Sequence, residues 1–165
     1  MNVPAVALVA PEAIHVDLGM VEIEQILPHR GGALVIHKVH IHESTRASGY
    51  FSVCVDDTRI QDHFGIMPGV LIAEFVHLTG AVLMMFTDRE VFPILNTSMI
   101  EVALPAMPGD GLTCEVELID QTKRRFTFRG EVFNQYGKSV ATVHFTGTRF
   151  PRRMLERIKI NQTSL

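Results

Sequence analysis

The feature that most constrains the fold is the apolar segment that follows Pro68-Gly69. Its seventeen residues, Val70 to Phe86, are apolar on every side of a helix and carry only Glu74 and His77 as ionisable side chains. A helix with no polar face has to be surrounded by protein or by lipid. The segment falls just short of the length that spans a bilayer, so it predicts a buried core helix and no membrane span.

Segments with the character of β-strands stand on both sides of this helix in the sequence. A short amphipathic helix is predicted over residues 20–28, and strands over 33–43, 48–55, 93–104, 112–120, 124–134 and 139–150. The last three strands are separated by short turn sequences, which favours antiparallel hairpins in meander order.

A single helix can bury all its faces only if the sheet curls around it. The predicted fold class is therefore α+β, a strongly curved antiparallel sheet wrapped around one long central helix. One such subunit leaves an edge strand and part of the helix exposed. A dimer that joins two sheets edge to edge covers both, so we expect a homo-oligomer.

Length and composition limit the remaining possibilities. The 165 residues suit a single domain, and a net charge of -3 gives no electrostatic reason to expect nucleic acid as the partner. Cys54 and Cys114 lie in alternating apolar patterns, so both are predicted to be reduced core residues of a cytoplasmic protein. We expect an N-terminal arm over residues 1–19, one domain over 20–150 and a basic C-terminal extension over 151–165.

His63 and Glu74 are the strongest candidates for chemistry. Apolar residues surround Glu74 in the sequence, so we expect its pKa to be raised and its carboxyl to donate a proton near neutral pH. His63 precedes the helix on a loop, where it can remove a carbon-bound proton while Glu74 protonates a departing hydroxyl. The alternative is a structural Glu74 that pairs with an arginine or with His77 one turn later.

The start of the long helix adds possible hydrogen-bond donors. The amide groups of Gly69 and Val70 belong to the first turn, where N–H groups have no partner within the helix and face the positive end of its dipole. Such donors can polarise a carbonyl oxygen and stabilise the charge that develops on it. The same Pro68-Gly69 sequence also fits an ordinary helix start.

Several sequence motifs occur in a recognisable order. They are Leu27-Pro28-His29-Arg30, ALVIHKV at 33–39, QDHF at 61–64, PGVLIAE at 68–74 and PAMPGD at 105–110. Together, over roughly residues 20–150, they resemble the β-hydroxyacyl-acyl-carrier-protein dehydratases of the FabZ type. The resemblance implies a hot-dog fold, a dimer as the basic unit, often three dimers together, and an active site shared across the dimer.

The resemblance also implies roles for individual residues. His63 would be the base, Glu74 of the partner subunit the acid, and the Gly69 amide the donor to the thioester carbonyl. Val70 and Phe64 complete the predicted substrate-binding residues. The substrate would be an (R)-3-hydroxyacyl chain on the phosphopantetheine arm of an acyl carrier protein, which would lose water to give the trans-2-enoyl product without a cofactor.

The sequence departs from the family pattern in ways that bear on function. The loop between His63 and Pro68 is shorter than usual, and Asp62 stands where the family has glycine, so its carboxylate is a candidate to hold the histidine ring. Residues 102–104 are apolar where the family has basic residues that commonly help to hold the carrier protein. A hot-dog thioesterase, in which Glu74 directs water at the carbonyl, and a non-catalytic subunit that binds the carrier protein therefore remain alternatives.

Three further histidines raise the question of a metal. They are His37, His40 and His42, and residues at i and i+2 of a strand, as His40 and His42 are, share a face. No carboxylate or cysteine accompanies them at ligand spacing, so a solvated strand face is favoured and no metal is predicted.

Overall fold

The computed structural model describes residues 13–154, so most of the predicted arm and of the predicted basic extension lies outside the described residues. Seven strands form one antiparallel sheet in the order β1-β2-β3-β5-β6-β7-β4. Their bounds are β1 Ala13–Leu18, β2 Lys38–Glu43, β3 Arg46–Ser52, β4 Val91–Val102, β5 Gly111–Gln121, β6 Arg125–Asn134 and β7 Ser139–Pro151.

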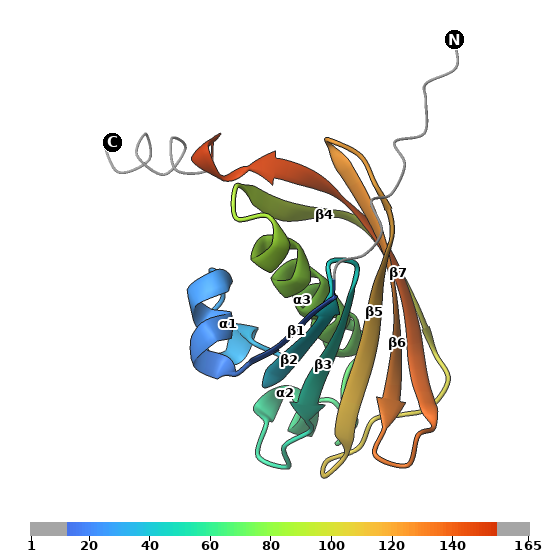
Figure 1. The fold of residues 1–165 in the computed structure, drawn as a ribbon. Coiled ribbons are helices and arrows are strands. Elements are labelled where there is room, and N and C mark those ends of the chain that lie inside the picture. Colours follow the sequence, from blue (N-terminus) through green and yellow to red (C-terminus); the bar gives the residue numbers. More distant parts are fainter. Residues whose placement is uncertain (1–12, 155–165) are drawn as a thin grey trace, which may run out of the picture.

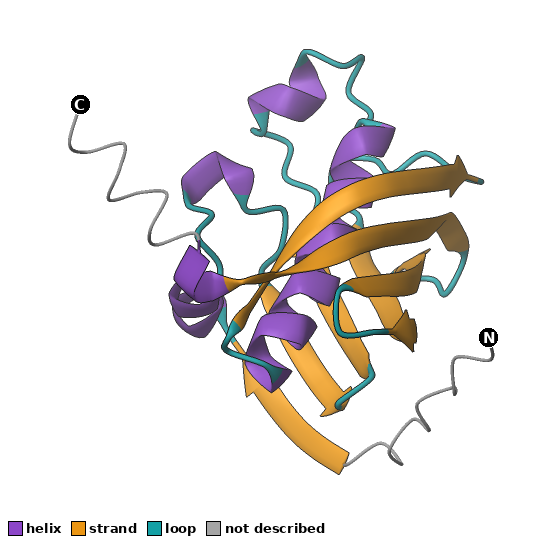
Figure 2. Ribbon diagram, turned by 90° about the horizontal axis from the view of Figure 1, so that it is seen from above, coloured by secondary structure: helices purple, strands orange, loops and turns teal. Residues whose placement is uncertain are grey.

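Helix α3, Gly69–Thr87, lies inside the curve of this sheet (Figures 1 and 2). The arrangement confirms the predicted α+β fold, and strands β5, β6 and β7 form the predicted meander. By length and composition α3 is apolar enough to cross a membrane, but 61% of its most apolar window is buried inside the fold. Its apolar surface is therefore used in the core.

Glycines on the sheet allow it to lie directly on α3. A side chain at Gly49 of β3 would overlap the Thr79 hydroxyl, and one at Gly130 of β6 would overlap Val76. Because interiors are close-packed, these positions set how near the sheet comes to the helix.

The sheet begins earlier than the sequence indicated. Strand β1 lies in the segment expected to form an arm over residues 1–19, and its Val16 pairs with Ile41 of β2. The alternation of Ile14, Val16 and Leu18 is short, but an edge strand needs only one partner. Strands β1 and β4 are the two edges of the sheet.

The short elements and connections account for the remaining differences. Helix α1 is Met20–Ile26, a 3₁₀ turn is Gly31–Ala33, and an unpredicted helix α2 is Thr58–Gln61, where the Asp57 side chain accepts from the Arg59 amide at 2.9 Å. Residues 34–36 precede β2 as a buried segment and do not extend the strand.

The two cysteines differ in their surroundings. Cys114 is buried on β5, as predicted, whereas Cys54 is exposed because it follows the end of β3, so its prediction as a core residue is wrong. Both are free thiols.

Candidate active site

Glu74 lies on the second turn of α3 and borders a largely apolar cavity of about 280 Å³. Its side chain is 38% exposed. Three aromatic rings, Phe126, Phe128 and Phe145, form part of the cavity wall. The carboxyl group therefore stands at an opening between apolar walls and solvent, a position from which it can contact a bound apolar ligand.

A hydrogen-bonded chain connects Glu74 to strand β4 through His77. The Nδ1 atom of His77 lies 3.4 Å from Glu74 Oε2, and its Nε2 atom lies 2.8 Å from the hydroxyl oxygen of Ser98. The imidazole also packs edge-on against Phe145, with ring centroids 4.9 Å apart. His77 is therefore held on three sides and fixes the position of the carboxylate.

This contact reverses the expected pKa shift of Glu74. The hydrogen bond from His77 lowers the pKa of the carboxyl, burial opposes that effect, and the charges of His77 and His29 lower it further. The prediction of a raised pKa is thus wrong for the single chain. The observed contact with His77 is one of the two pairings expected for a structural Glu74. The residues on either side of Glu74 in the sequence, Ala73 and Phe75, are buried in the core, while His77 at i+3 shares the face of the helix on which Glu74 lies.

His29, from the first of the sequence motifs, lines the same cavity. Its Nδ1 atom is buried and has no hydrogen-bond partner among residues 13–154. A buried polar atom without a partner is costly unless something else satisfies it. The position next to the cavity makes a polar group of a ligand a suitable partner.

His63 lies on the loop that follows α2, and its side chain is exposed. Its Nδ1 atom is 3.1 Å from the carbonyl oxygen of Ile66. A carbonyl oxygen only accepts, so in the neutral ring the proton stays on Nδ1 and Nε2 keeps its lone pair. A backbone atom, and not the carboxylate of Asp62, therefore orients the ring and leaves Nε2 ready to take a proton.

The loop between His63 and Pro68 turns through two residues with positive φ. Phe64 has φ 55° and Gly65 has φ 67°. This conformation is uncommon for a bulky residue and shows that the short connection is made at the cost of backbone strain. The Phe64 side chain is 95% exposed, so it projects away from the protein.

The predicted substrate-binding residues divide into two groups. Gly69 lines an open hollow of about 300 Å³ together with His63, Val102 and Leu104. Phe64 and Val70 do not line it and are 95% and 74% exposed. The amides of Gly69 and Val70 are at the first turn of α3, as expected.

His63 and Glu74 line different cavities of the single chain. One copy therefore does not bring the two predicted groups together. His77 is recognisable in the sequence by its spacing from Glu74, whereas Ser98 has no sequence signal because its contact depends on where β4 lies in the sheet.

Comparison with known proteins defines the class and then the family. The fold is that of hot-dog proteins: a hypothetical thioesterase from Streptococcus pneumoniae, solved with coenzyme A, superimposes with a TM-score of 0.58 over 66% of this chain and 80% of that chain at 15% identity. No family model matches the chain.

Relatives of known family identify which hot-dog family the chain belongs to. The 3-hydroxyacyl-[acyl-carrier-protein] dehydratase FabZ of Clostridium perfringens is 32% identical over 129 residues, which cover 74% of this chain and 86% of the relative. That of Bacillus subtilis is 33% identical, covering 74% and 85%. The chain belongs to the FabZ family of 3-hydroxyacyl-[acyl-carrier-protein] dehydratases.

Proposed function

We propose that the protein dehydrates (3R)-hydroxyacyl chains carried by acyl carrier protein to trans-2-enoyl chains, with His63 as the base and Glu74 of a second subunit as the acid. The observation that carries the proposal is the contact of His63 Nδ1 with the Ile66 carbonyl oxygen, which leaves Nε2 as the acceptor atom of the neutral ring, beside the first turn of α3. Membership of the FabZ family supports the choice of substrate and carrier.

The reaction balances with these groups alone. His63 Nε2 takes the proton from the carbon next to the thioester carbonyl, and the electrons of that bond form the new double bond. The hydroxyl leaves from the next carbon with the proton of Glu74, as water. The amides of Gly69 and Val70 stabilise the negative charge that develops on the carbonyl oxygen. No redox step occurs, so the proposal requires no cofactor.

The edge strand β4 supports a dimer as the working unit. Apolar side chains with substantial exposure lie along it, namely Ile94, Leu95, Met99 and Val102. An exposed apolar edge strand is a liability that pairing with a second copy removes. Residues from both cavities lie on or beside β4, so a partner across this edge would bring the His63 of one chain toward the Glu74 of the other.

The acid role requires Glu74 to be protonated when the substrate is bound. In the single chain its pKa is lowered, chiefly by His77. A partner subunit and an acyl chain would cover the exposed part of the carboxyl and increase the burial that already raises its pKa. We therefore expect the assembled, occupied site to hold the neutral acid.

Turnover of defined substrates tests the proposal. The full chain is incubated with hydroxybutyryl acyl carrier protein, and formation of the enoyl thioester is followed by its absorbance and by mass spectrometry. His63→Ala and Glu74→Gln should each reduce the rate by about 10² or more, the usual contribution of an acid or base. Retention of the wild-type rate in both variants refutes the mechanism, and tight binding of the carrier without turnover supports a non-catalytic subunit.

A thioesterase is the second candidate, and the observation that favours it is the contact of Glu74 with His77, which lowers the pKa of the carboxyl. An ionised carboxylate held by His77 can take a proton from water as the water attacks the thioester carbonyl. Several hot-dog structures that superimpose on the chain are described as thioesterases. Release of free thiol from the acyl carrier protein or from acyl coenzyme A distinguishes hydrolysis from dehydration.

A further inference from the structure

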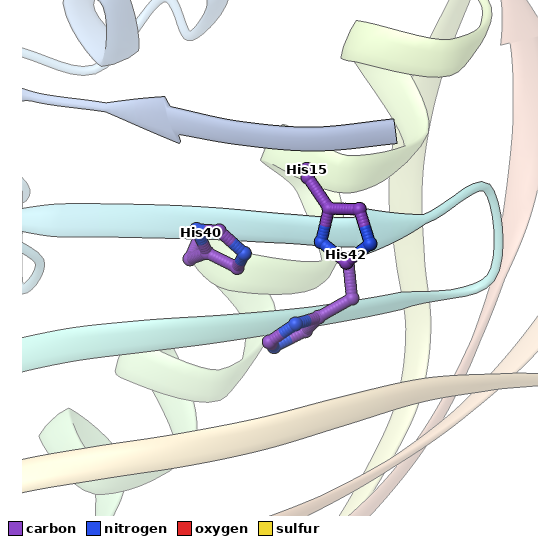
Figure 3. Close-up of side chains that lie close together, drawn as sticks. All are labelled: His15, His40 and His42. Atoms are coloured by element: carbon purple, nitrogen blue, oxygen red, sulfur yellow. The ribbon is translucent and has the colours of Figure 1, made fainter. Parts of the chain in front are cut away.

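Three histidines meet on the outer face of the sheet, away from α3. His15 comes from β1, and His40 and His42 come from β2, where they alternate with fully buried residues of the core face. One ring nitrogen from each histidine lies within 4.8 Å of the others. Figure 3 shows the three side chains gathered over these two neighbouring strands. None of them lines the cavities of Glu74 or His63.

The hydrogen bonds of His40 leave one of its ring nitrogens free. Its Nδ1 atom donates to Asp17 Oδ1 at 3.0 Å, and Lys38 contacts the same oxygen at 3.1 Å. Because this carboxylate oxygen also faces the ammonium group of Lys38, it is the acceptor of both contacts. The proton of the neutral His40 ring is therefore on Nδ1, and Nε2 keeps a lone pair.

A second series of hydrogen bonds, from His42 through Ser48 to Glu115, fixes the tautomer of His42. The hydroxyl of Ser48 lies 2.8 and 2.9 Å from the two carboxylate oxygens of Glu115, to which it donates. It therefore accepts from His42 Nε2, which lies 2.5 Å away. Nδ1 of His42 is left unprotonated. Ser48 is only 1% exposed, so the central residue of this hydrogen-bonded series is buried.

These two arrangements are those that metal-binding histidines adopt. A ligating imidazole usually donates its other N–H to a carboxylate or a hydrogen-bonded acceptor, which fixes the ring and increases the basicity of the coordinating nitrogen. In these arrangements Nε2 of His40 and Nδ1 of His42 keep their lone pairs, as coordination of a metal ion requires.

The third histidine is positioned by an irregularity of the backbone. Between the pairs Ala13↔Glu43 and Val16↔Ile41, β1 contains one residue more than β2, which is a β-bulge. His15 lies in this bulge at φ 50°, a left-handed conformation that favours glycine. Bulges re-aim side chains, and strained residues are often found at binding sites. Here the bulge brings the His15 ring centroid to 6.1 Å from that of His40.

We propose that His15, His40 and His42 form a binding site for a divalent transition metal, with Zn²⁺ as the best fit. Three neutral imidazoles are a common zinc ligand set, and water completes a tetrahedron. A zinc ion about 2.0–2.1 Å from each nitrogen requires the nitrogens to be roughly 3.4 Å apart, so the side chains rotate inward by a small amount on binding.

The proposed site has a structural role. The ion would link the six-residue edge strand β1 to β2 and so hold the first part of the described chain on the sheet. His37, the histidine that the sequence pattern grouped with His40 and His42, is not part of the site. Its Nδ1 atom accepts from the amide of Ser52 at 3.2 Å.

Zinc titration of the full chain tests the proposal. The protein is prepared without a histidine tag, stripped of metal and titrated in competition with a chromophoric chelator. We expect one Zn²⁺ per chain and a rise in the melting temperature that excess chelator reverses. Co²⁺ bound in the same stoichiometry should give the visible absorption of a tetrahedral nitrogen-ligated ion.

Variants locate the bound ion. The exposed His15→Ala should weaken zinc binding by more than tenfold, and Asp17→Asn, which leaves all three ligands in place, by about tenfold, as expected for a residue that orients a ligand. The control His144→Ala, an exposed histidine on β7, should bind as the wild type does.

Two outcomes would overturn the proposal. One is a folded wild-type protein that binds no stoichiometric zinc. The other is zinc binding that survives unchanged in His15→Ala and in a variant in which all three histidines are replaced. Far-ultraviolet circular dichroism shows that each variant is folded, and dehydration rates are expected to be independent of zinc.

Discussion

Mixing two inactive variants tests whether the active site is shared between subunits. In the single chain His63 and Glu74 line different cavities, so under the proposed mechanism a complete site takes one group from each of two chains. A dimer of His63→Ala with Glu74→Gln then contains one site with both groups replaced and one with both intact. Each variant alone has no intact site and should retain less than about one hundredth of the wild-type rate.

The expected recovery follows from this geometry. Random pairing of equal amounts gives about half heterodimers, and each has one working site of two, so the mixture should reach about a quarter of the wild-type rate. The variants are co-expressed with different tags, the heterodimer is isolated through both tags, and initial rates of enoyl formation are compared. The isolated heterodimer should show about half the wild-type rate. A verified heterodimer as inactive as its parents refutes the shared site.

Two further predictions concern the surroundings of α3. His77→Phe removes the hydrogen bond that lowers the pKa of Glu74, so that pKa rises; if Glu74 is the acid, the alkaline limb of the pH–rate profile moves to higher pH, and an unchanged profile contradicts that role. Gly130→Ala places a methyl group against Val76, so the free energy of unfolding should fall by about 1–3 kcal/mol in denaturant titration. Gly32→Ala, where the added carbon meets nothing within 4 Å, is the control and should change it little.

Much of the fold could be predicted because its central element is unambiguous. A helix without a polar face, flanked by alternating segments, requires a sheet that curls around it. Strand β1 was not predicted because its apolar alternation is short and it lies at the edge of the sheet, where half of its residues are exposed to solvent. Cys54 was wrongly predicted to be buried because no proline or glycine in the sequence marks the end of β3, two residues earlier.

The sequence was enough to select candidate residues for the site but not to predict the electrostatics of Glu74. His63 and Glu74 stand out by their place at the start of α3 and by the motifs around them. The pKa of Glu74 was predicted in the wrong direction because its neighbours in sequence differ from its neighbours in space. Ser98, which completes the hydrogen-bonded chain through His77, is brought there by β4, and no local pattern marks that contact.

The hydrogen bond from His63 to the carbonyl oxygen of Ile66 makes the orientation of the ring depend on the backbone of the loop. Any side chain at position 66 supplies the same carbonyl oxygen, so substitutions there preserve the tautomer. An insertion or deletion in the four residues from Phe64 to Met67 would move that oxygen and release the ring. A change in the length of this connection is therefore expected to disturb the His63 ring more than a substitution of Ile66 does.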